Sequence, residues 1–173
     1  QPRRYPRRNI TIEQLREALK PLRSSQLFEN SIVVLLQESS AQPLQLSQFQ
    51  LDAIIQQIRN LQADTDQSLV IGAGTAAGKT KAFYLPALAY IAENIRLNHA
   101  TTQALALYPR TELLKDQLAE AFSEARKLDS LLLKAGKRHI SIGAYYGDTP
   151  KRAADFSNPY KPSGWKQTDD LRG

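Results

Sequence analysis

The stretch VIGAGTAAGKTKAFYLPAL at residues 70–88 joins a short apolar run to a longer segment with the periodicity of a helix. A cluster of Gly, Ala and Thr fills the junction and ends in Gly78-Lys79-Thr80. A strand that leads into a helix at such a point presents unpaired backbone amides and the positive end of the helix dipole. The junction therefore predicts a phosphate-binding loop. Lys79 would supply a point charge for the β- and γ-phosphates, and the Thr80 hydroxyl would be a ligand for Mg²⁺.

The segments on either side of this loop alternate between helix and strand patterns. Helical periodicity, in two cases preceded by a capping-box pattern at Thr11/Gln14 and Ser47/Gln50, is found at 11–22, 47–62, 79–97 and 111–132. Short apolar runs predict strands at 68–74, 101–109 and 139–146. The run at 31–37 fits either a buried strand or a helix. This alternation predicts an α/β fold, with a parallel sheet covered by helices.

Composition narrows the classes of function. The 173 residues fit one domain or slightly more, and the absence of cysteine excludes disulfides and a Cys nucleophile. His99 and His139 have no partner at metal-ligand spacing, so we expect surface or loop positions for both. No apolar run reaches the roughly 18 residues of a transmembrane helix, and no signal peptide is visible, which favours a soluble cytoplasmic protein. The net charge of +6 favours polyanionic partners, although a basic surface without a specific partner is the alternative.

The chain divides into three regions by its patterns. Residues 1–46 read as an N-terminal arm and helical extension, 47–156 as the α/β region that contains the phosphate loop, and 157–173 as a loop or linker; the family resemblance given below implies that 47–156 are the first half of an ATP-binding domain. Four arginines and two prolines surround Tyr5 within residues 1–9, and we expect a mobile, solvated tail there, with phosphate contact as the alternative. The chain begins at Gln1 and contains no Met, so we expect it to be a piece of a longer protein.

Four segments resemble motifs of one enzyme family. The pattern A-x-T-A-x-G-K-T at 73–80 resembles motif I of superfamily 2 helicases of the DEAD/DEAH-box type. Ala73 stands where the general phosphate-loop pattern has its first glycine. YPRTELLKDQ at 108–117 resembles motif Ia, with its middle pair inverted to Arg110-Thr111. GDTP at 147–150 and FQLDAI at 49–54 are weaker matches. The MrfA-like group of large bacterial helicases and helicases of anti-phage defence systems look most similar.

The resemblance implies an incomplete P-loop NTPase domain of the RecA-like type, which binds ATP and Mg²⁺ and acts on nucleic acid, with DNA favoured over RNA. It gives Lys79 and Thr80 catalytic roles, Thr80 being the Mg²⁺ ligand. The nucleotide-binding residues that it implies are Gln50, Gly74, Thr75, Ala76, Ala77, Gly78, Lys79 and Thr80. Gln50 would read the adenine, and its capping-box role is an equally open alternative. The nucleic-acid contacts that it implies are Arg110, Thr111, Glu112 and Thr149, with capping of a helix by Thr111 as an alternative or additional role.

One expected element of the family is missing from this sequence. No apolar strand ends in Asp-Glu, so the carboxylates that hold Mg²⁺ and orient water are absent. We therefore expect this segment to bind nucleotide weakly without turning it over. Hydrolysis and translocation would require the remaining helicase domains, and other subunits of a larger complex are further expected partners. Two alternatives stay open: a P-loop kinase or other small-molecule NTPase, and a non-catalytic binding module.

Overall fold

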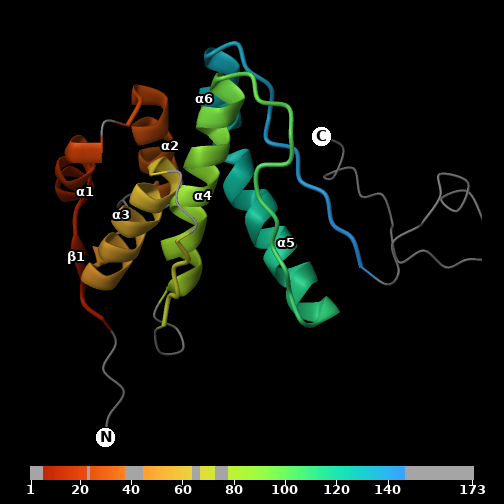
Figure 1. The fold of residues 1–173 in the computed structure, drawn as a ribbon, viewed down its shortest axis with the longest axis horizontal. Helices are drawn as coiled ribbons and strands as arrows, with labels where there is room; N and C mark the ends of the chain where they lie inside the picture. The colour runs from red at the N-terminus through yellow and green to blue at the C-terminus, as the bar shows by residue number, and fades with distance from the viewer. Residues whose placement is uncertain (1–5, 23, 38–44, 64–66, 73–77, 147–173) are drawn as a thin grey trace, which may run out of the picture.

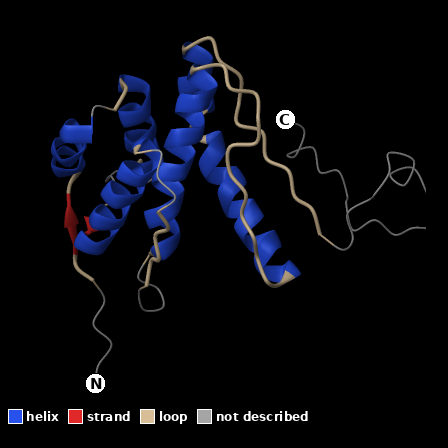
Figure 2. Ribbon diagram, viewed as in Figure 1, coloured by secondary structure: helices blue, strands red, loops and turns tan. Residues whose placement is uncertain are grey.

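The computed structural model describes residues 6–22, 24–37, 45–63, 67–72 and 78–146. Most of the described chain is helical, as Figures 1 and 2 show. The elements in chain order are β1 (Arg8–Ile10), α1 (Ile12–Leu19), the 3-10 helix η1 (Lys20–Leu22), α2 (Gln26–Leu36), β2 (Leu46–Ser47), α3 (Gln48–Gln62), α4 (Lys79–Arg96), α5 (Thr111–Arg126) and α6 (Asp129–Lys134).

Local hydrogen bonds fix where the first helices begin. Thr11 and Gln14 form the predicted capping box at the start of α1, because each side chain bonds the backbone amide of the other. Ser25 caps α2 by accepting a hydrogen bond from the Phe28 amide at 3.1 Å. The run at 31–37, for which the sequence pattern fits either a strand or a helix, forms the C-terminal end of α2 and its C-cap.

The helix α4 is the centre of the hydrophobic core. It packs most extensively against α2 and α3, and in Figure 1 it stands between these two helices and α5. Its apolar residues are buried on several sides, among them Ala82, Leu85, Leu88, Ala89, Ala92 and Ile95. A helix buried on more than one side needs such a broad apolar surface. The helix continues through Pro86, which is itself buried.

The end of the N-terminal arm is paired with another strand, which departs from the expected mobile tail, although residues 6–9 are exposed as expected and residues 1–5 lie outside the described part of the chain. Residues Arg8–Ile10 form β1, which pairs antiparallel with β2, so that Arg8 lies opposite Ser47 and Ile10 opposite Leu46. Ile10 and Leu46 are both buried in the core. The hydrophobic anchor at Ile10 explains the difference, because burial of this side chain favours holding the arm against the helices.

The predicted parallel sheet is not formed by the described residues. The structure assigns no strand to 67–72, 101–108 or 139–146, and the pairing of β1 with β2 is the sheet found in the described chain. Several apolar side chains in the first two segments stay exposed, namely Val70 at 90%, Leu105 at 81% and Leu107 at 82%, whereas Ile140 in the third is buried at 4%. A strand depends on a neighbour that pairs with its amides and carbonyls, and local β-propensity alone does not supply one.

None of the helices in the described part of the chain combines the length and the apolar character that crossing a bilayer requires.

Leu85→Ala tests whether the burial of α4 stabilises the fold. Leu85 is 1% exposed, so the substitution removes packed methyl groups and leaves a cavity; the free energy of unfolding should fall by about 2–5 kcal/mol. Leu97→Ala, at a residue 49% exposed just after α4, is the matched control and should change it by less than about 0.5 kcal/mol. Urea denaturation followed by circular dichroism measures both, and equal losses would contradict the assigned core.

Glu93 in α4 makes the stability depend on pH. Hydrogen bonding from Arg96 outweighs the opposing effect of burial and, with a bond from the Ser25 hydroxyl at 2.6 Å, lowers the pKa of Glu93 below its ordinary value of 4.5. A lowered pKa in the folded state adds stability that is present above pH 4.5 and is lost as the pH falls through the folded value. Glu93→Gln should therefore destabilise the protein at pH 7 and weaken its loss of stability in acid. Denaturation midpoints at pH 7 and pH 4 measure this, and parallel pH profiles for the two proteins would refute it.

Candidate functional site

The first turn of α4 carries the residues that end the predicted phosphate loop. Gly78 is the N-cap with a left-handed backbone (φ 82°, ψ 34°), and Lys79 and Thr80 are the first residues of the helix. The N-cap residue supplies no side-chain acceptor for the first amides of this helix. A helix start without such a cap favours the binding of an anion. All three residues are half-buried. The predicted loop residues Gly74, Thr75, Ala76 and Ala77 lie outside the described part of the chain.

Gln50 connects the start of α3 to the start of α4. Its Oε1 accepts hydrogen bonds from the Ser47 amide at 2.8 Å and from the Ser47 hydroxyl at 3.0 Å. Its Nε2 donates to the Gly78 carbonyl at 2.8 Å. The side chain is 2% exposed, so these bonds satisfy a buried amide. The capping interaction with Ser47 is therefore observed, and the same amide also holds the last residue of the predicted loop.

The close approach of Gln50 explains why residue 78 is a glycine. A Cβ on Gly78 would stand 2.6 Å from Gln50 Nε2 and 3.5 Å from Arg8 Nη2. The left-handed φ already disfavours any residue with a Cβ. The backbone conformation therefore favours glycine at this position, and a Cβ there would also displace the Gln50 amide from its bond to the Gly78 carbonyl.

The predicted nucleic-acid residues lie at the start of a different helix. Thr111 and Glu112 are the first residues of α5, and Arg110 is its N-cap. The expectation that Thr111 caps this helix is wrong, because the helix starts one residue earlier than a Thr111 cap requires and no side chain caps it. Arg110 and Glu112 are exposed, while Thr111 is half-buried. Thr149 lies outside the described residues.

Hydroxyl groups link α4 to the segment that leads into α5. Tyr84 of α4 donates a hydrogen bond to the Gln117 carbonyl at 3.1 Å, and its oxygen lies 3.3 Å from that of Tyr108. Burial, followed by the hydrogen bond with Tyr108, raises the pKa of Tyr84, so the phenol stays neutral. This contact was not predictable from the sequence, because two tyrosines 24 residues apart form no recognisable pattern.

A partly buried ion pair makes a second link, between α4 and α5. Lys81 Nζ lies 2.7 Å from Glu124 Oε1, and Lys127 Nζ lies 2.8 Å from the same oxygen. The side chains of Lys81 and Glu124 are 18% and 10% exposed, so water screens this pair less than an ordinary surface pair. Lys81 follows Thr80 directly, and sequence reasoning missed its role because its partner lies 43 residues away.

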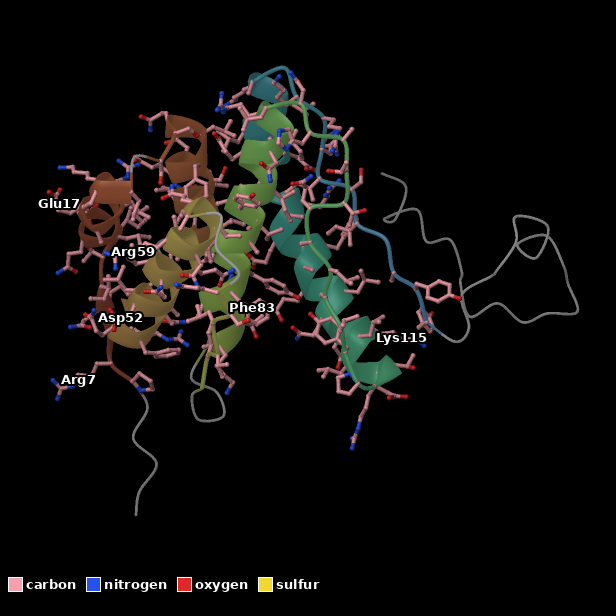
Figure 3. The ribbon with its side chains drawn as sticks, in the orientation of Figure 1. Arg7, Glu17, Asp52, Arg59, Phe83 and Lys115 are labelled. Atoms are coloured by element: carbon pink, nitrogen blue, oxygen red, sulfur yellow. The ribbon has the colours of Figure 1, made fainter. Side chains whose placement is uncertain are left out.

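Other features of the described residues contribute little to a catalytic site. No group of three or more His, Cys, Asp or Glu that could hold a metal occurs in the described part of the chain. His99 and His139 are exposed, as predicted, and His139 Nδ1 lies 3.0 Å from Asp129 Oδ1. A surface pocket of about 490 Å³ lies between α3, the 67–71 segment and Phe83, which Figure 3 labels. None of the site residues that the sequence predicts lines this pocket.

Comparisons with known proteins agree with the motifs. A family model described as DEAD/DEAH box helicase matches residues 48–155, which include Gln50, the loop and the start of α5. The curated Druantia protein DruE of Escherichia coli (strain UMEA 4076-1) is 33% identical over an alignment that covers 55% of this chain. The alignment spans only 6% of the length of that relative. No solved structure matches the chain significantly.

Gly78→Ala tests the contact between the loop end and α3, with Gly136→Ala as the matched control. Both glycines have positive φ, 82° and 66°, but a Cβ on Gly136 would meet nothing within 4 Å. Backbone strain should cost roughly 1–2 kcal/mol of unfolding free energy at each site. At Gly78 the clash with Gln50 should add about 1 kcal/mol or more. Chemical denaturation of the two variants measures the difference, and identical losses would show that the close approach does not exist in solution.

Proposed function

Because the chain belongs to the DEAD/DEAH box helicase family, we propose that it is the ATP-binding part of a helicase or translocase that acts on nucleic acid, with DNA favoured over RNA. The family supports an ATP-dependent, helicase-type function and a RecA-like P-loop fold. The chain spans a small part of the curated relative, so the activity of the whole protein, its substrate and its partners are parts of this proposal. The proposal extends to a cytoplasmic role in anti-phage defence, which the sequence resemblance supports.

The observation that carries this proposal is the uncapped first turn of α4 behind a left-handed Gly78. A helix start of this kind directs its backbone amides at a negatively charged group, and small residues precede it in the sequence. In our proposal the amides of 76–79 bind the phosphates, and Lys79 neutralises the β- and γ-phosphate charge. Gly74 and Thr75 complete the loop. Gln50 orients the loop through its bond to the Gly78 carbonyl. Its oxygen accepts hydrogen bonds from Ser47, so Gln50 contacts the adenine only if these bonds are replaced by bonds to the base.

Thr80 is suited to bind the divalent cation that this family uses with ATP. Its hydroxyl is a hard oxygen ligand of the kind that Mg²⁺ prefers, and it lies beside the lysine that faces the phosphates in our proposal. When bound, Mg²⁺ would supply positive charge to the phosphate oxygens. The residues of this chain would bind and orient the nucleotide, and the remaining helicase domains would complete hydrolysis.

Nucleic acid would meet the start of α5. Arg110 offers an exposed guanidinium, and the first amides of α5 lack a side-chain cap, so both are suited to backbone phosphates. Thr111 and Glu112 complete this edge, and Thr149 is the fourth residue that the sequence resemblance assigns to it. The hydrogen bond from Tyr84 to the Gln117 carbonyl and the Lys81–Glu124 ion pair connect this helix to α4 and give the two sites a physical link.

Lys79→Ala in the full-length protein tests the proposed function. Loss of the lysine should reduce nucleic-acid-stimulated ATP hydrolysis by roughly 100-fold or more, because the phosphate charge loses its neutralising group. Lys134→Ala removes an exposed lysine at the end of α6 and should leave the rate unchanged. Phosphate release assayed with single-stranded DNA, duplex DNA and RNA also identifies the preferred nucleic acid. ATP turnover that is unaffected by Lys79→Ala would remove the proposal.

A further inference from the structure

The pairing of β1 with β2 places an arginine from the N-terminal arm beside the end of the predicted phosphate loop. Arg8 lies opposite Ser47 in this pairing, and Ser47 in turn bonds Gln50, which holds Gly78. The Arg8 Nη2 atom lies 3.5 Å from the point where a Cβ would stand on Gly78. Three segments that are distant in sequence therefore meet at one residue of the loop.

The guanidinium of Arg8 meets no opposite charge among the described residues. No carboxylate of the described chain lies within ion-pair distance of it. The first turns of α3 and α4, which begin next to it, contain no acidic residue. The nearest acidic position along α3 is Asp52, and its Oδ1 accepts a hydrogen bond from Gln48 at 2.9 Å. An exposed cation that lies beside the loop end without an opposite charge has the electrostatic setting of an anion-binding group.

We propose that Arg8 is a further nucleotide-binding residue, which pairs with a phosphate oxygen of the nucleoside di- or triphosphate bound at the start of α4. This inference rests on the proposed function. A guanidinium presents a planar fork of donors that matches phosphate geometry, and it keeps its charge at every physiological pH. Arg8 adds a second positive group to Lys79 and comes from outside residues 48–155, the region that the family model matches. The N-terminal strand thereby becomes part of the nucleotide site.

The neighbouring arginine provides a matched control for this assignment. Arg7 directly precedes β1, and Figure 3 shows its side chain pointing away from α3 and α4 at the lower end of the strand. Arg7→Ala and Arg8→Ala remove the same charge from adjacent positions of one segment. Effects of net charge alone should therefore be equal in the two variants, and contact with the bound nucleotide should appear only in Arg8→Ala.

Calorimetric titration of the full-length protein with Mg-ATP and Mg-ADP tests the inference. Arg8→Ala should weaken both affinities about 10-fold, as expected for the loss of one partly exposed charge-assisted contact. Arg8→Lys should recover part of the loss because it keeps the charge, and Arg7→Ala should bind like the unmodified protein. The melting temperature without nucleotide should be the same for Arg8→Lys as for the unmodified protein, which separates ligand contact from folding.

Three results would overturn the inference, and one of them would also remove the proposed function. If Arg8→Ala binds ATP normally while Lys79→Ala does not, Arg8 is not a ligand and the proposed function stands. If both variants bind ATP normally, the proposed function falls as well. If Arg8→Ala weakens binding of single-stranded DNA in the absence of nucleotide but leaves ATP affinity unchanged, the anion that Arg8 meets belongs to the nucleic-acid backbone.

Discussion

The position of the first turn of α4 depends on the burial of the rest of that helix. Leu85, Leu88 and Ala92 pack into the core formed with α2 and α3, so the helix has little freedom to rotate or slide. Gly78 therefore stands at the end of a rigid element, and the buried Gln50 amide bonds its carbonyl from a second one. A binding group mounted on packed helices in this way keeps its geometry before a ligand arrives.

Short-range signals made much of the helical structure predictable. The Thr11–Gln14 spacing identified the start of α1, and Ser47 with Gln50 identified the start of α3, because capping depends on residues only three positions apart. Long-range contacts were not predictable in this way. An arm rich in arginine and proline reads as a tail until Ile10 is seen to be buried. The strands expected at 68–74, 101–109 and 139–146 depend on pairing partners, which apolar composition does not identify.

The candidate site shows the same division between local and distant information. Glycine, lysine and threonine in sequence predict the end of a phosphate loop, and the region that the family model matches includes these residues. The bond from Gln50 to Gly78 spans 28 residues and required the tertiary structure. The capping interaction of Gln50 with Ser47 follows the local pattern that the sequence shows, whereas no local pattern exists for the ion pair of Lys81 with Glu124. The nucleotide-binding roles of Gln50 and of residues 74–80 stay predictions, as do the nucleic-acid-binding roles of Arg110, Thr111, Glu112 and Thr149.

The extended segments with exposed leucines have a consequence for how this polypeptide behaves at high concentration. Leu105 and Leu107 follow each other at a two-residue interval in a stretch whose side chains are mostly in contact with water. An extended stretch of this kind can template a strand from another copy, and no charged residue interrupts it between Thr101 and Pro109. Self-association by edge-to-edge pairing therefore competes with whatever covers these leucines, and the outcome depends on protein concentration.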